Sequence, residues 1–279
     1  SSAASDVYKR QAPMSFLPEN SDWWLRDESG EIVTGWMGGW EPFYKCNFDH
    51  PDFQDNIARQ CKIAMESGVY DGVMLDWSGH TDIIRKTRET IGDVPLIIVN
   101  IHDDIEDGET YKDYINGSFM ELNIEDDTWI PVGNGRNWDK AREALLWFEE
   151  NLQEPRINCL ENWGDRKDLS RMRATTCLGL THSDGFVLYA DPNPLKTPDH
   201  LHDWYPFWDV ELGKPLGPRT DQVDGSCWRE FEGGMVVYNH YGNADITIHF
   251  ESDHRRISDG STGTEFSMSG RDGDIFVKL

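Results

Sequence analysis

The sequence is poor in basic residues. It has 26 Lys and Arg against 51 Asp and Glu, which gives a formal net charge of -25 and a pI near 4.6. Binding to nucleic acid requires clustered Lys and Arg that neutralise phosphates, and an anionic membrane surface attracts the same residues. No apolar run has the length of a transmembrane helix. We therefore expect neither nucleic acid nor a membrane as a partner.

Motifs for metals, disulfides and phosphates are also missing. The five cysteines are widely spaced and odd in number, which favours neither a zinc site nor a disulfide framework. The histidines include no HxH pair, and His80, His102 and His182 are scattered. No metal and no cofactor is predicted. A metal-dependent barrel hydrolase, such as a deacetylase or amidohydrolase, stays open as an alternative, which stoichiometric zinc in the purified protein would support.

Residues 1–11, SSAASDVYKRQ, resemble the in-frame translation of a sequencing adapter used with transposase-based libraries. Such segments are left out of fold reasoning. We expect the natural sequence to start near Ala12 and to be the downstream part of a longer gene. The localisation of the protein is therefore left open.

Strands and helices alternate along the first two thirds of the chain. Residues 71–77, DGVMLDW, form an apolar run without alternation that ends on Asp76, which is typical of a parallel strand covered on both faces. Further strands are expected at residues 95–100, 117–125, 156–163 and 185–191, and helices at 52–67, 82–91, 138–152 and 171–180. This order indicates βαβ units. With no Gly-rich phosphate-binding motif, it favours the later part of a (β/α)8 TIM barrel over a Rossmann fold.

The pattern changes after Trp208. A Pro- and Gly-rich linker, GKPLGP (213–218), leads into short strands separated by turns, which predicts a small all-β antiparallel sandwich. The predicted organisation is therefore a non-native segment (1–11), part of a catalytic-type barrel (12–208) and a β-sandwich domain (209–279).

Four segments carry a resemblance: DWWLRDESGEIV (22–33), HPDF (50–53), DGVMLDW and REFEGGMVVYN (229–239). From about Asp22 to its end, the chain resembles uncharacterised TIM-barrel proteins described as glycoside hydrolases. These carry a β-sandwich like that of alpha-amylase and alpha-galactosidase relatives. The resemblance implies that the strand ending at Asp76 is the fourth of the barrel, so that about three strands are lacking. It also implies that the chain alone is inactive and poorly soluble. A monomeric, cooperatively melting preparation with glycosidase activity would contradict this.

Glycoside hydrolysis requires two carboxyl groups, one of them a proton donor. Asp76 is the candidate nucleophile, because it ends a packed strand. Glu121 is the first candidate acid and Glu161 its competitor. A separation of about 5–5.5 Å between the two carboxyl groups would indicate a retaining enzyme, and about 6.5–9.5 Å an inverting one.

Polar and aromatic residues near the strand ends are candidates for binding the carbohydrate. Aromatics make up 12% of the chain, with 12 Trp, which suits stacking on sugar rings and equally suits core packing. Trp23, Trp24 and the GWMGGW stretch (35–40) could line a cleft or pack within a loop. If no carboxylate faces Asp76, a non-catalytic carbohydrate-binding protein or pseudoenzyme is the better interpretation. The predicted binding residues are Trp77, His80, Asn100, His102, Trp163, Tyr189 and Asp191.

Overall fold

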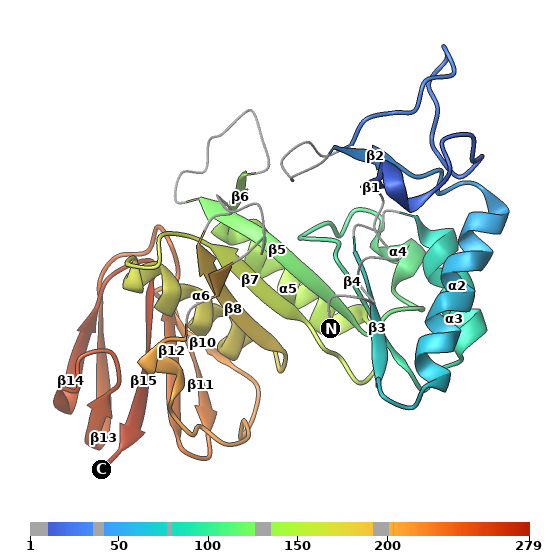
Figure 1. Ribbon diagram of the computed structural model, residues 1–279. Coiled ribbons are helices and arrows are strands. Elements are labelled where there is room, and N and C mark those ends of the chain that lie inside the picture. The colour runs from blue at the N-terminus through green and yellow to red at the C-terminus, as the bar shows by residue number, and fades with distance from the viewer. Residues whose placement is uncertain (1–10, 36–41, 77–79, 126–134, 192–200, 203) are drawn as a thin grey trace. The chain divides into compact units, whose positions relative to one another are not determined.

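The computed structural model describes residues 11–35, 42–76, 80–125, 135–191, 201–202 and 204–279 (Figure 1). Trp77 and residues 36–40 of the GWMGGW stretch lie outside the described residues. The chain divides into two compact units. The first unit holds residues up to Phe119 together with 151–157, and the second holds 120–150, 158–191 and the described residues from 201 onwards.

Two amphipathic helices dominate the first unit, α2 (Pro51–Glu66) and α3 (Thr81–Ile91), which lie side by side in Figure 1. The start of α2 follows from its sequence. Pro51 takes a first-turn position where its missing N–H costs nothing, and the His50 ring accepts a hydrogen bond from the Asp52 amide at 3.2 Å. Phe53, Ile57 and Cys61 recur at helical spacing and form its buried face.

Strands β3 (Gly72–Leu75) and β4 (Leu96–Val99) and the start of β5 (Gly117–Glu125) run parallel in the first unit. Gly72 is required by close approach, because a Cβ there would lie 2.4 Å from the Leu96 carbonyl oxygen. A one-turn helix, α4 (Gly108–Tyr111), lies between β4 and β5. The predicted strands and helices of this part are confirmed to within three residues at each end.

A short antiparallel pair near the N-terminus was not predicted. β1 (Gln11–Pro13) pairs with β2 (Phe43–Lys45), and the 3-10 helix η1 (Met14–Phe16) follows β1. Trp24 is 1% exposed, and its indole N–H donates to the Pro18 carbonyl. Strands of three residues show no measurable periodicity, which is why the sequence did not reveal them.

The second unit continues the alternation. After β5 come β6 (Gly135–Asn137), α5 (Trp138–Asn151), β7 (Cys159–Trp163), α6 (Leu169–His182) and β8 (Phe186–Asp191). β7 and β8 pair in parallel, whereas β9 (Leu201–His202) returns antiparallel to β8. The hydrogen-bonded strand order is β3-β4-β5-β7-β8-β9, with β6 on β5. Among the described residues, no helix combines the length and apolar character needed to cross a membrane.

The C-terminal residues are all-β, after the 3-10 helix η2 (Pro206–Trp208). Their six antiparallel strands have the order β10-β11-β12-β15-β13-β14. Val237, Phe266 and Phe276 are central to their core. The predicted fold class, a partial α/β barrel followed by an all-β antiparallel region, is confirmed. The predicted boundary between residues 208 and 209 stays a prediction. The bounds are β10 (Thr220–Asp221), β11 (Cys227–Phe231), β12 (Gly234–Asn239), β13 (Ile246–Arg256), β14 (Thr262–Met268) and β15 (Asp272–Lys278).

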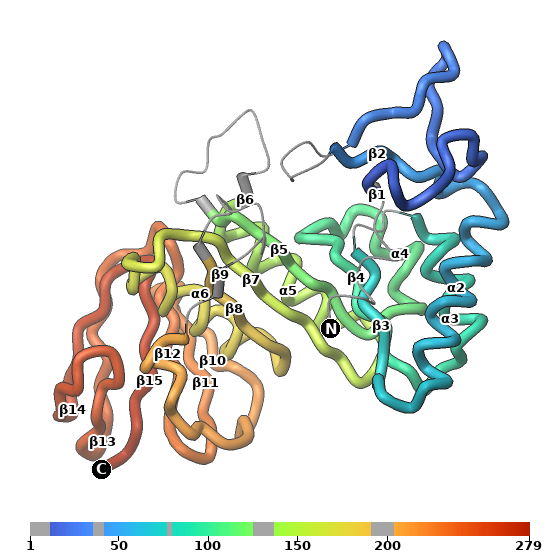
Figure 2. The backbone as a smooth tube through the Cα atoms, in the orientation of Figure 1, coloured from blue at the N-terminus to red at the C-terminus, as the bar shows by residue number. Residues whose placement is uncertain are grey.

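Helix α6 packs against both parts of the second unit, β8 on one side and β12 and β15 on the other (Figure 2). Gly273 permits a close approach, since a Cβ there would lie 2.4 Å from the Cys177 Cβ. Arg173 of α6 forms a two-point ion pair with Asp272 of β15, at 2.9 and 2.7 Å. The antiparallel sheet is therefore docked on a barrel helix by tight packing and by charge.

We expect Asn116→Ala to destabilise the first unit. The buried Asn116 side chain accepts from the Ile97 amide at 3.0 Å and from Arg88 at 2.8 Å, and its amide donates to two further carbonyls. Leaving buried donors unsatisfied should cost about 2–4 kcal/mol in urea unfolding. The matched control is Asn56→Ala, whose half-buried side chain accepts a hydrogen bond from the exposed Arg59 guanidinium on α2, so that a change above about 0.5 kcal/mol there would contradict the argument.

We also expect stability to fall with acidification through His182. Burial, followed by the charge of Arg219, lowers the pKa of this histidine from 6.5 to about 3. Between these values the unfolded chain takes up a proton that the folded chain does not, so stability is lost as pH falls below 6.5, by about 1.4 kcal/mol per pH unit. Denaturant titrations from pH 7 to 5 should show a shallower fall for His182→Gln. The exposed His249→Gln should behave as the unmutated chain.

Candidate functional site

Asp76 directly follows β3 and is half-buried. Because β3 and β4 run parallel with Leu75 opposite Val99, the residues after them, Asp76 and Asn100, come next to each other. The Asn100 amide donates to Asp76 Oδ1 at 3.0 Å, and Asn100 is only 3% exposed. The structure thus brings together a predicted catalytic residue and a predicted binding residue, and the buried amide orients the carboxylate.

The turn after β4 holds His102 in an uncommon conformation. Its φ of 55° lies in the left-handed region, which non-glycine residues seldom adopt. Its carbonyl accepts a hydrogen bond from the Ser118 hydroxyl at 3.2 Å. Backbone strain of this kind tends to persist where the surroundings over-determine it, often at functional sites. His102 lies two residues beyond Asn100, at the carboxyl end of β4, in this strained conformation. Its role in binding stays a prediction.

His80 lies at the N-cap of α3 and is held by aromatic packing. Its ring stacks on Phe48 with centroids 5.0 Å apart and planes at 24°. Phe48 in turn packs edge-on against Phe53, as does Trp23. The His80 Nδ1 lies 3.7 Å from the Asp49 carboxylate. His80 is therefore fixed near the end of β3 by an aromatic cluster that sequence reasoning did not identify.

The alternation of β5 decides where Glu121 lies. Met120, Leu122 and Ile124 are buried, while Glu121 and Asn123 between them are half-buried. Successive residues of a strand point to opposite faces, so Glu121 and Asn123 share the less buried face. Glu121 stands in the middle of β5 rather than at its end, since the strand continues to Glu125.

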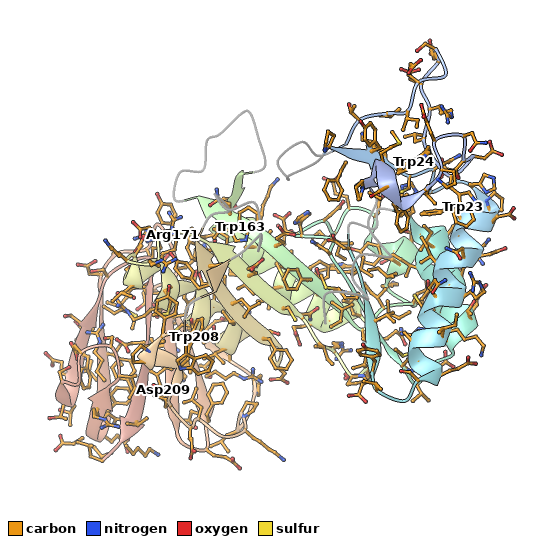
Figure 3. The ribbon with its side chains drawn as sticks, in the orientation of Figure 1. Trp23, Trp24, Trp163, Arg171, Trp208 and Asp209 are labelled. Carbon is orange, nitrogen blue, oxygen red and sulfur yellow. The ribbon has the colours of Figure 1, made fainter. Side chains whose placement is uncertain are left out.

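Strand β7 presents Glu161 and Trp163 on one face, and Figure 3 labels Trp163 at the end of the strand. The intervening Asn162 points the other way, toward α6, where its amide donates to Thr175 at 2.8 Å. Glu161 is 0% exposed. Cys159 shares its face, and burial raises the pKa of that thiol to about 11, so the thiol stays protonated at neutral pH. Glu161 and Trp163 thus lie on the face turned away from α6.

Tyr189 on β8 lies opposite Asn162 and therefore faces α6 as well. It is 0% exposed, and its hydroxyl donates to the Asp165 carbonyl at 3.1 Å. Burial raises the pKa of this phenol. The observed hydroxyl contact supports the loop after β7, and a contact with sugar stays a prediction. Asp191 ends β8 opposite Leu201.

Asp76, Asn100, His80 and His102 belong to the first unit, and Glu121, Glu161, Trp163 and Tyr189 to the second. The pairing of Asp76 with either glutamate therefore stays a prediction. Within the described part of the chain, no group of three or more His, Cys, Asp or Glu has an arrangement suited to a metal ion.

We expect Tyr189→Phe to lower stability, whether or not Tyr189 also contacts a sugar. The substitution removes one of the two hydrogen bonds that the Asp165 carbonyl accepts, the other coming from the Asp168 amide at 2.8 Å, and its loss should cost about 1 kcal/mol in thermal or urea unfolding. Tyr70→Phe, on an exposed ring, is the matched control. A loss of sugar affinity in Tyr189→Phe with unchanged stability would instead assign the hydroxyl to binding.

No protein-family model matches the sequence, and no curated protein matches it either. Solved structures do match in fold. An alpha-amylase from Lactobacillus plantarum superposes with a TM-score of 0.58 at 10% identity, over 99% of this chain and 77% of that one. A maltogenic alpha-amylase from Thermotoga neapolitana gives 0.53 at 10% identity, over 97% and 76%.

A cyclic alpha-maltosyl-(1→6)-maltose hydrolase from Arthrobacter globiformis, solved with maltose, gives a TM-score of 0.51 at 10% identity, over 96% of this chain and 74% of that one. At such identities the likeness concerns the fold. The chain therefore shares the fold of alpha-amylase-type glycoside hydrolases, a barrel followed by a C-terminal sheet domain.

Proposed function

We propose that the protein is a glycoside hydrolase that cleaves an oligo- or polysaccharide by a two-carboxylate mechanism. The observation that carries the proposal is the Asp76 carboxylate at the carboxyl end of β3, oriented by the buried Asn100 amide. Barrel enzymes hold their chemistry at this end of the strands. The amylase-type neighbours supply the carbohydrate substrate class as an analogy of fold.

In this mechanism Asp76 acts as the nucleophile of a retaining reaction or as the base of an inverting one. An amide that donates to one carboxylate oxygen stabilises the ionised form that either role needs. The second carboxyl group protonates the glycosidic oxygen as the bond to the leaving sugar breaks. Glu121 is the first candidate, because it is half-buried and accessible, and the fully buried Glu161 is the second.

We further propose, from the resemblance alone, that full activity belongs to a longer protein of which this chain is a fragment. Glycosidase activity should therefore be measured for this chain and for the protein translated together with any sequence upstream of it in the gene. A cooperative melt of each preparation separates misfolding from an inactive site.

We expect Asp76→Asn to lower kcat by roughly 10²–10⁴-fold, because the removed carboxylate takes part in the transition state. The assay uses aryl glycosides and oligosaccharides with α and β linkages. Asp71→Asn, an exposed carboxylate at the opposite end of β3, should leave kcat unchanged.

Leaving groups distinguish the acid from the nucleophile. A variant of the acid, Glu121→Gln or Glu161→Gln, should lose activity on oligosaccharides and keep it on aryl glycosides whose leaving group needs no proton. Asp76→Asn should lose both. If every preparation binds carbohydrate without hydrolysing it, the protein is a carbohydrate-binding protein and the proposal is wrong. If the protein contains stoichiometric zinc and its activity depends on that metal, it is a metallohydrolase instead.

A further inference from the structure

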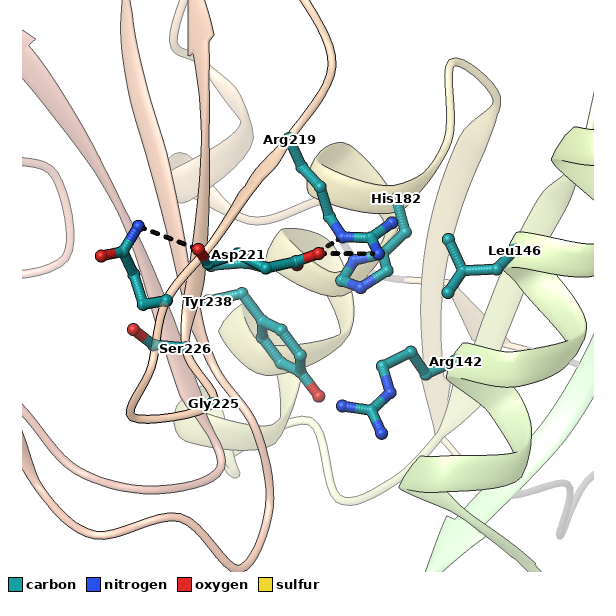
Figure 4. Close-up of a pocket in the computed structure, with 10 residues that line it drawn as sticks. Arg142, Leu146, His182, Arg219, Asp221, Gly225, Ser226 and Tyr238 are labelled. Carbon is teal, nitrogen blue, oxygen red and sulfur yellow. Dashed lines mark hydrogen bonds and ion pairs between the residues drawn. The ribbon is translucent and has the colours of Figure 1, made fainter.

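A pocket of about 350 Å³ lies within the second unit, between α5, α6 and the start of the antiparallel sheet (Figure 4). A neighbouring pocket of about 560 Å³ shares Leu146, His182, Arg219 and Asp221 with it. None of these residues belongs to the predicted carbohydrate site. The volume is at the lower end of the range for small-molecule sites, which suits a ligand of the size of a substituted monosaccharide.

Two guanidinium groups reach this pocket from different segments. Arg142 extends from α5 toward the Tyr238 hydroxyl, and Arg219 enters from the segment before β10. Asp221 is the carboxylate among the lining residues. Each arginine is paired with one carboxylate, Arg219 with Asp221 and Arg142 with Asp139, which lies outside the lining. An anion would therefore bind to the guanidinium N–H groups that these two ion pairs leave over.

Each arginine is held in place while part of its guanidinium stays available. Arg219 donates Nε and Nη2 to Asp221 at 2.7 and 3.2 Å. None of the hydrogen bonds between described residues uses its Nη1 atom, which can therefore donate to a ligand. Arg142 donates Nη2 to Asp139 at 2.9 Å. Asp139 also accepts from His240 Nε2 at 2.9 Å, and His240 Nδ1 accepts from the Tyr238 hydroxyl at 2.8 Å. This chain of contacts orders Arg142 before any ligand arrives, which lowers the entropic cost of binding.

His182 lines the pocket as a neutral imidazole. Its Nδ1 lies 3.1 Å from the Leu178 carbonyl, which can only accept, so Nδ1 carries the hydrogen. Burial is the largest cause that lowers the pKa of His182, and the charges of Arg219 and Arg142 lower it further, while the opposing influence of Asp221 is weaker than either.

We propose that this pocket binds a small ligand through an anionic group, a phosphate ester or a carboxylate, held between Arg142 and Arg219. Guanidinium groups match both anions through paired N–H donors. The site is separate from the proposed hydrolase chemistry and stands whether or not that chemistry is found.

The test is isothermal titration calorimetry at constant ionic strength with inorganic phosphate, glucose 6-phosphate, glucuronate and glucose. We expect saturable binding of the anionic probes and none of glucose, and comparison of glucose 6-phosphate with glucuronate assigns the anion. Arg142→Gln and Arg219→Gln should each raise Kd about tenfold or more, since each removes a charged hydrogen bond. Arg85→Gln, on the exposed face of α3, should leave Kd unchanged.

Two further variants keep the test decisive. Asp221→Asn removes a negative charge that repels the anion and should therefore lower its Kd. If the Arg219–Asp221 ion pair has a structural role alone, the same variant should lower stability and leave binding of the anion unchanged. Arg142→Lys keeps the charge and should retain part of the affinity if Arg142→Gln fails to fold. Equal affinity for glucose and glucose 6-phosphate, equal Kd in all arginine variants, or no saturable binding of any anionic probe would each overturn the proposal.

Discussion

The two-residue alternation of the parallel strands is the constraint on which the candidate hydrolase site depends. One face of each strand is committed to packing, so a side chain that carries chemistry must fall on the other. In β7, Leu160 and Asn162 are buried on the α6 side, which places Glu161 and Trp163 on the opposite face. The same rule puts Tyr189 against α6. A shift of one residue in either strand would exchange these sets completely.

Helix α6 packs against the parallel strand β8 and also against the antiparallel strands β12 and β15. The helix meets β8 through Gly179, where a Cβ would lie 2.2 Å from Val187, and it meets β15 through Cys177 and Gly273. Buried polar side chains of this helix form hydrogen bonds, as Thr176 does with the Met172 carbonyl and the Trp208 indole. His182 ends this helix in the same surroundings, which is why its imidazole stays neutral.

The sequence revealed the elements whose length and pattern are strong. Strand β5 was predicted with its observed bounds, residues 117–125, and the helices to within about two residues. Strands β1, β6, β9 and β10 have two or three residues and leave no periodic signal. Asp76 and Asn100 were found because both follow apolar strands. The face of β8 on which Tyr189 lies could not be predicted, because the apolar residues of FVLYAD do not alternate with polar ones. The pairing of β8 with β7 determines it.

The anion pocket escaped sequence reasoning because its residues come from α5, α6 and the segments around β10 to β12, with no common motif. Its energetics argue for a role. A neutral histidine beside two arginines lowers stability in mild acid, and an uncharged residue in its place would avoid that cost. Stability that is given up locally tends to be retained where a site is functional. An anion that binds between Arg142 and Arg219 in the folded protein alone would stabilise the second unit by mass action.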